Sequence, residues 1–141
     1  MMKISILYPN NQGARFDMGY YLATHMPLAI ELLSVHPGFK GVSVDRGLGR
    51  LVSGEDAAHV ATCHFLFDST EDFMAAFTPH AATLQGDIPN YTNIEPVIEV
   101  NEIVMSLVLF VTVRGLTLRS RGTRQKRAPL NFTLGTLVFY L

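Results

Sequence analysis

One histidine stands out as a candidate for proton chemistry. His25 follows the tyrosine pair Tyr20-Tyr21 and is followed at once by Met-Pro-Leu. Proline has no amide hydrogen and crowds the turn before it, so Pro27 is expected to kink or restart a helix and to free backbone groups near His25. An imidazole has an ordinary pKa of ~6.5, so modest burial or a phenol partner could make His25 a general acid or base. The alternative is a core histidine whose ring hydrogen-bonds a carbonyl freed by the proline.

Several other side chains could share this site. Tyr21 lies one helical turn before His25 and could orient the imidazole or a ligand, whereas Tyr20 points about 100° away around the helix. His25 and Tyr21 are therefore the predicted catalytic residues. Residues of the predicted substrate-binding set are spread along the chain: Tyr20, His64, His80 and Asp87. A structural role in packing or in turn capping remains the alternative for each of them.

Other kinds of site are not supported by the sequence. The histidines show neither His-x-x-x-His spacing nor a histidine and carboxylate at ligand spacing, so no metal site is expected. Gly47-Leu48-Gly49 lacks the third glycine of a dinucleotide-binding loop, and the chain contains no Gly-x-Ser-x-Gly motif. Cys63 is the single cysteine and lies in an apolar alternating run, which favours a packed thiol. No cofactor is therefore expected.

The elements that must position these residues follow from hydrophobic periodicity and turn residues. Strands are predicted at residues 3–8, 39–46, 59–67 and 96–104, with loops at 47–57 and 86–93. Asp17 and Ser69 are predicted to cap two helices between the strands, and Thr78-Pro79 to kink or end the second helix. The order β-α-β-β-α-β predicts an α+β, ferredoxin-like fold, with an antiparallel four-stranded sheet and both helices on one face.

The second face of this sheet is expected to meet a partner. Val60 and Leu66 fall on the strand face opposite Cys63 and Phe65, and both faces of residues 59–67 are too apolar for a solvated surface. A two-fold homodimer is the simplest source of a covering sheet.

The distribution of charge predicts a domain boundary near Met105/Ser106. All 12 acidic residues of the 141-residue chain lie between Asp17 and Glu102. Residues 1–105 also hold five basic residues, whereas residues 106–141 hold six basic residues and no acidic ones. Residues 1–105 are therefore predicted to form one domain, and residues 106–141 a basic extension that is either disordered, an added hairpin or non-native.

Composition also limits which partners and which cellular location are expected. The extension lacks the aromatic interleaving and base-reading motifs of a dedicated nucleic-acid binder, so specific nucleic-acid binding is not expected. The longest apolar run, at residues 103–113, is well short of the ~20 residues that a membrane span requires. The first residues have the pattern of a strand rather than of a signal peptide, so we expect a cytoplasmic protein.

Several short segments of the first 105 residues together form a recognisable family pattern. They are Phe16-Asp17, Tyr20-Tyr21, His25-Met26-Pro27-Leu28, Pro37-Gly38-Phe39-Lys40-Gly41, Phe67-Asp68-Ser69 and residues 86–93. Through these segments, residues 3–105 resemble the EthD family of the dimeric α/β-barrel superfamily. The resemblance implies a ferredoxin-like fold, back-to-back dimerisation of two sheets into a barrel, and a cavity between sheet and helices. Proteins of the family often carry an oxidoreductase label, but the family pattern has no nicotinamide or flavin motif.

Two functions are consistent with these observations. The first is a cofactor-independent enzyme of the oxidoreductase or isomerase type that acts on a small apolar carbonyl or aromatic compound, with His25 transferring a proton and Tyr21 orienting the substrate. The second is a non-catalytic module that binds a hydrophobic ligand or supports an oxidative degradation pathway.

Overall fold

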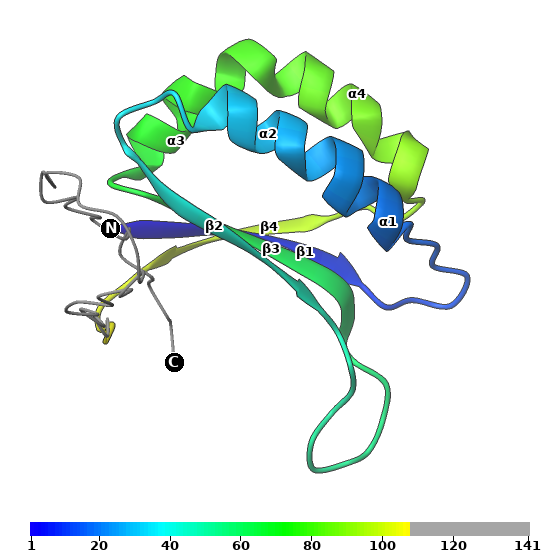
Figure 1. The fold of residues 1–141 in the computed structure, drawn as a ribbon. Coiled ribbons are helices and arrows are strands. Elements are labelled where there is room, and N and C mark those ends of the chain that lie inside the picture. The colour runs from blue at the N-terminus through cyan, green and yellow to red at the C-terminus, as the bar shows by residue number, and fades with distance from the viewer. Residues whose placement is uncertain (108–141) are drawn as a thin grey trace, which may run out of the picture. The chain divides into compact units, whose positions relative to one another are not determined.

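The computed structural model describes residues 1–107, so the predicted properties of the basic extension lie almost entirely outside the described residues. Contacts divide the chain into two units, Met1–Ile103 and Val104–Leu141, and the fold below is that of the first. Its helices cover one face of a four-stranded sheet (Figure 1). No helix in the described part of the chain is long and apolar enough to cross a membrane.

The sheet is antiparallel with the strand order β2-β3-β1-β4, which confirms the predicted ferredoxin-like fold. The register places Ile4 of β1 opposite Phe65 and Val100, and these side chains point towards the helices. The strands are β1 (Met2–Pro9), β2 (Phe39–Arg46), β3 (His59–Phe67) and β4 (Val97–Glu102).

The first helical segment has an irregular turn at the site of interest. It consists of α1 (Met18–Tyr20), a π-helical turn η1 (Tyr21–His25) and α2 (Met26–Leu33). Asp17 caps its start by accepting a hydrogen bond from the Tyr20 amide at 2.9 Å, as predicted. The Met26 amide bonds the carbonyl of Tyr21, five residues back, just before Pro27, which has no amide to offer. Pro27 therefore accounts for the widened turn that carries His25.

The second helical segment corrects one prediction. It consists of α3 (Thr70–Phe77), a 3₁₀ turn η2 (Thr78–His80) and α4 (Ala81–Tyr91). Ser69 accepts a hydrogen bond from the Asp72 amide, which confirms the predicted cap, and Thr78-Pro79 falls in the 3₁₀ turn where an interruption was predicted. The predicted loop at residues 86–93 is wrong, because α4 continues through Gly86 and Pro89.

Tertiary packing explains why α4 tolerates these two residues. Leu84 and Tyr91 are buried and Ile88 is partly buried, so spacings of four and three residues place all three side chains on one inward face. Pro89 lies exposed in the last turn of the helix, where its missing amide removes one hydrogen bond to the preceding turn. Burial of the inward face therefore outweighs the helix-breaking tendency of glycine and proline.

The core lies between the helices and the central strands. Its fully buried side chains include three tyrosines and Cys63, the thiol predicted to be packed. The edge strand β4 is different, because all six of its residues are exposed although Ile98 and Val100 face the helical side of the sheet. The helices thus leave β4 uncovered, and a hollow remains beside it.

Candidate active site

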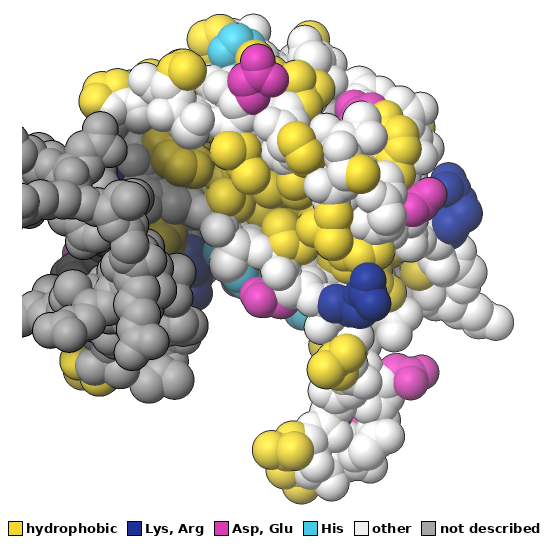
Figure 2. Space-filling view, viewed as in Figure 1, with side chains coloured by type: hydrophobic (Ala, Val, Ile, Leu, Met, Phe, Trp, Pro, Cys, Tyr) yellow, Lys and Arg dark blue, Asp and Glu magenta, His cyan; other side chains and the backbone are white. Residues whose placement is uncertain are grey.

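An apolar cavity of about 290 Å³ lies between the sheet and the helices. Hydrophobic side chains gather in this layer, as Figure 2 shows on one face of the molecule. No Lys, Arg, Asp or Glu lines the cavity, and His25 is the one histidine among its lining residues. The lining comes from β1, β3 and β4 on one side and from the helices on the other: it includes Ile4, Ile6, Tyr8, Tyr21, Phe65, Phe73, Ile88, Tyr91, Ile98 and Val100.

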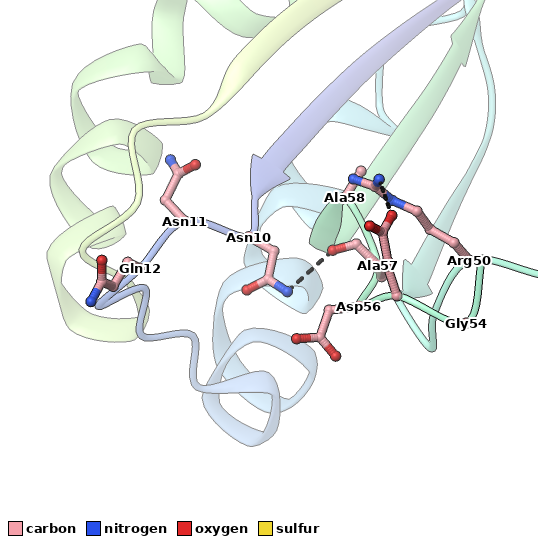
Figure 3. Close-up of a pocket in the computed structure, with 9 residues that line it drawn as sticks. Asn10, Asn11, Gln12, Arg50, Gly54, Asp56, Ala57 and Ala58 are labelled. Carbon is pink, nitrogen blue, oxygen red and sulfur yellow. Dashed lines mark hydrogen bonds and ion pairs between the residues drawn. The ribbon is translucent and has the colours of Figure 1, made fainter.

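A wider hollow of about 810 Å³ lies between the turn after β1 and the loop that joins β2 to β3 (Figure 3). Its polar groups largely bond one another: Asn10 donates to the Ala57 carbonyl at 3.1 Å, and Arg50 pairs with Glu55 at 2.7 Å. No histidine lines this hollow. The apolar cavity is therefore the candidate active site.

His25 is fixed by one hydrogen bond and two aromatic rings. Its Nδ1 lies 2.8 Å from Oδ2 of Asp87. The imidazole stacks on Tyr21 with ring centroids 5.3 Å apart, and the ring of Tyr91 packs against it at 4.6 Å. Nε2 has no hydrogen-bond partner among residues 1–107 and is not sealed from solvent. A nearly buried imidazole with one nitrogen held and the other available is an arrangement suited to proton transfer.

Asp87 is itself held by two further donors. The hydroxyl of Tyr20 donates to Oδ1 at 2.7 Å, and the amide of Asn90 donates to the same oxygen at 2.9 Å. Partial burial opposes ionisation, but the hydrogen bonds from Asn90, Tyr20 and His25 outweigh it and lower the pKa of Asp87. Asp87 is therefore an ionised carboxylate at neutral pH, and it favours the His25 tautomer that carries its proton on Nδ1.

The structure brings some of the predicted site residues to His25 and leaves the others away from the cavity. Tyr20, Tyr21 and Asp87 surround His25. Tyr20 and Asp87 were predicted to bind substrate, but they bond each other, and Asp87 also bonds the imidazole. His80 lies half-buried in η2 and does not line the cavity.

His64 belongs to the opposite face of the sheet. Its Nδ1 lies 2.8 Å from the hydroxyl of Ser5, and its Nε2 lies 3.4 Å from the Asp45 carboxylate. Burial and the nearby charge of Lys3 lower the pKa of His64, against the opposing effect of Asp45. The structure therefore does not bring this histidine to the cavity that holds His25.

Two tyrosines that line the cavity were not predicted as site residues from the sequence. The hydroxyls of Tyr8 and Tyr91 lie 2.8 Å apart in the core, and both side chains line the cavity. Burial raises the pKa of Tyr8, an effect that hydrogen bonds from Tyr91 and Tyr21 partly oppose, and burial together with Tyr8 raises the pKa of Tyr91. Tyr8 is the last residue of the predicted strand at residues 3–8, so the alternation of that strand could have indicated that its side chain faces the core. Tyr91 fell in the predicted loop at residues 86–93, where no pattern indicated burial.

A metal is not supported by the described side chains. Within residues 1–107, no three His, Cys, Asp or Glu residues lie close enough together to hold a metal ion. Burial raises the pKa of Cys63 to about 12, so its thiol stays protonated and is a poor metal ligand.

Comparison with known proteins identifies similar chains. Residues 13–95 match the model of the EthD domain. An EthD-like protein from Ralstonia eutropha, known from a crystal structure, is 41% identical with a TM-score of 0.68, over 74% of this chain and 92% of that chain. An ethyl tert-butyl ether degradation family protein from Bacillus halodurans is 18% identical with a TM-score of 0.51, over 74% of this chain and 99% of that one. The comparison with curated proteins gave no match.

Proposed function

The chain belongs to the EthD family, and we propose that it is an enzyme that transfers a proton on a small, uncharged carbonyl or aromatic compound. The observation that carries this proposal is the hydrogen bond between His25 and Asp87 at the wall of an apolar cavity. The fold alone would not support a reaction, because one fold hosts many activities.

The proposed roles follow from the two nitrogens of the imidazole. Nδ1 donates its proton to the Asp87 carboxylate, so Nε2 keeps its lone pair and acts as the base towards a ligand in the cavity. When Nε2 takes up a proton, the adjacent carboxylate stabilises the imidazolium that forms. The stacked ring of Tyr21 restricts the orientation of the imidazole, so Tyr21 is a positioning residue in this scheme.

The cavity limits the class of substrate. No side chain with a full charge lines it, so a carboxylate or phosphate on the ligand would lose its hydration without gaining a counter-charge. Its volume of about 290 Å³ lies at the lower end of the range for small-molecule sites. A compact, neutral, mainly apolar compound is therefore the proposed ligand.

The proposal is tested by a screen of small ketones, phenols and aromatic compounds for turnover between about pH 5 and pH 9, across the range in which a histidine titrates. His25→Ala is expected to lower turnover by about 100-fold or more while ligand binding survives. His59→Ala is the matched control, since His59 lies at the start of β3 and does not line the cavity. Turnover that survives His25→Ala unchanged would refute the proton-transfer role.

A non-catalytic binding module is the second candidate, and the apolar lining favours it. Most of the lining side chains offer only hydrophobic contact, which suffices for binding. Ligand binding without turnover of any compound in the screen would support this alternative over the enzyme.

We also propose that two copies pair through the open face of the sheet. Leu66 is buried there by its neighbours, whereas Leu7 and Val60 are partly exposed and Val97 is 46% exposed. Two polar side chains between them, Ser5 and His64, already bond each other. Light scattering on the full chain at micromolar concentration is expected to give the mass of a dimer, and a monodisperse monomer would refute the pairing.

A further inference from the structure

Resting on the proposed function, we propose that Tyr8 is a second catalytic residue and that the substrate is an enolisable carbonyl compound. In this scheme the hydroxyl of Tyr8 binds the carbonyl oxygen, Tyr91 positions Tyr8, and His25 removes a proton from the carbon beside the carbonyl. The reaction is then enolisation, either as exchange at one carbon or as migration of a double bond.

The proposal begins with the protons of the buried phenol pair. The two hydroxyls lie 2.8 Å apart, and each carries one proton. One hydroxyl donates to the other, so the acceptor's own proton remains for a third group. Tyr21 acts on the Tyr8 hydroxyl as a donor, and no other described residue accepts a hydrogen bond from either hydroxyl of the pair. A ligand oxygen in the cavity that both tyrosines line is the natural acceptor.

Either hydroxyl of the pair could be the donor, and we assign that role to Tyr91. The bond from Tyr91 acts to lower the pKa of Tyr8 against the effect of burial, whereas the bond to Tyr8 raises the pKa of Tyr91, as expected when Tyr91 donates. The proton of Tyr8 is then left for a ligand in the cavity that both side chains line. In this arrangement the bond from Tyr91 polarises the Tyr8 hydroxyl and makes it a better donor.

The proposed base and the proposed donor belong to the wall of one small cavity and contact the same tyrosine. The ring of Tyr91 packs against His25 with centroids 4.6 Å apart, and the ring of Tyr8 lies 6.1 Å from that of Tyr91. All three side chains line the same cavity. A ligand that bonds Tyr8 through its oxygen can thus present the neighbouring carbon to Nε2 of His25.

The chemical step balances without an oxidant or a reductant. Nε2 forms a bond to the proton as the C–H bond breaks, the C–H electrons form a carbon–carbon double bond, and the carbonyl π electrons move to oxygen. The hydroxyl of Tyr8 stabilises the enolate oxygen, and the imidazolium then returns the proton to the same carbon or to a conjugated one. Burial raises the pKa of both phenols, so they remain protonated and can donate throughout.

The experiment follows exchange of the α-protons of cyclohexanone and of 2-cyclohexenone for deuterium by NMR in D₂O. The wild type is expected to accelerate the exchange, His25→Ala to abolish the acceleration, and Tyr8→Phe to reduce it by about 100-fold. Tyr91→Phe is expected to reduce the acceleration by about 10-fold, because Tyr8 can still donate to the ligand but is no longer polarised by a bond from Tyr91. Circular dichroism and thermal unfolding establish that each variant is folded.

A binding measurement separates a donor role from a purely structural one. The affinity of wild type for substituted phenols is expected to vary with phenol acidity, because the ligand oxygen shares the Tyr8 proton. This dependence is expected to weaken in Tyr8→Phe and in Tyr91→Phe, whereas affinity for anisole, a weak acceptor of similar shape, should stay within about 3-fold in both. If Tyr8→Phe does not fold, Tyr91→Phe carries the same test.

The outcomes distinguish this inference from the proposed function. Exchange that requires His25 but is unchanged in Tyr8→Phe would overturn the inference and leave proton transfer by His25 intact. His25-dependent turnover of other compounds, with no exchange of either ketone, would also overturn it. Absence of any His25-dependent turnover would refute both.

Discussion

The bond between His25 and Asp87 can be tested before any substrate is known. A double-mutant cycle uses Asp87→Asn, which removes the charge at constant shape, together with His25→Ala and the double variant. Nδ1 and Oδ2 lie 2.8 Å apart, and the two side chains are only 10% and 15% exposed, so water screens the contact little. A hydrogen bond to a charged group contributes about 1.5–3 kcal/mol, so we expect a coupling free energy of about 2 kcal/mol.

Urea unfolding followed by circular dichroism measures the four free energies at pH 7. A matched control is the contact between Lys40 and Asp68, at 3.0 Å with side chains 41% and 54% exposed, whose coupling is expected to stay below about 1 kcal/mol. Equal and small couplings in both pairs would refute the claim that His25 is held by a buried carboxylate.

The pH dependence of the same cycle has a defined sign. Because the pKa of Asp87 is lowered in the folded protein, its ionised form stabilises the fold above the unfolded pKa of ~3.9, and this contribution is lost as pH falls through the folded value. The difference in unfolding free energy between wild type and Asp87→Asn is therefore expected to shrink below about pH 4. A difference that is constant from pH 7 to pH 3 would contradict this sign.

Three further predictions concern other parts of the fold. Ser69→Ala removes the cap that accepts from the Asp72 amide at 3.1 Å, and it should lower the free energy of urea unfolding by about 1 kcal/mol; an unchanged value would show that the cap is not needed. Because burial raises the pKa of Cys63 to about 12, iodoacetamide at pH 8 should alkylate the thiol only as fast as the protein unfolds, and rapid labelling of folded protein would contradict its burial. The pKa of His64 is lowered in the folded protein, so its neutral form stabilises the fold above its unfolded pKa of ~6.5, and this contribution is lost as pH falls. The free energy of unfolding of His64→Gln should therefore decrease less between about pH 7 and pH 5 than that of the wild type. Equal decreases would refute the lowered pKa of His64.

The fold was largely predictable because local patterns and packing agree. Alternation in β3 and turn residues around β2 predicted the bounds of both strands, and the caps at Asp17 and Ser69 form as expected. Pro27 was also a sound signal, since the helix is interrupted at the turn before it. Each of these features depends on a few neighbouring residues, which is why the sequence sufficed.

The partners of His25 were not predictable in the same way. Asp87 and Tyr91 lie on α4, where Gly86 and Pro89 suggested a loop, and the inward face that stabilises the helix gains its energy only once the sheet is in place. The bond that holds His25 joins residues 62 positions apart, so no local spacing could indicate it. The alternative considered from the sequence was a bond from His25 to a carbonyl freed by Pro27. The observed partner is instead the carboxylate of Asp87, which is distant in the sequence.

The side of the sheet that His64 occupies depends on where the helices pack. Both faces of β3 carry apolar residues, and alternation alone separates the two faces without indicating which one is covered. The crossover of the helices selects the face of Cys63 and Phe65 for the core and leaves His64 on the other.

The most direct test of the central claim is ¹⁵N NMR of the His25 imidazole at neutral pH, with and without cyclohexanone or a small phenol. The account predicts a proton on Nδ1, held by Asp87, and an unprotonated Nε2 whose signal shifts when the ligand binds. In Asp87→Asn the preference for this tautomer should be lost. A proton on Nε2 in the free wild type, or an Nε2 signal that does not respond to a bound ligand, would contradict the account.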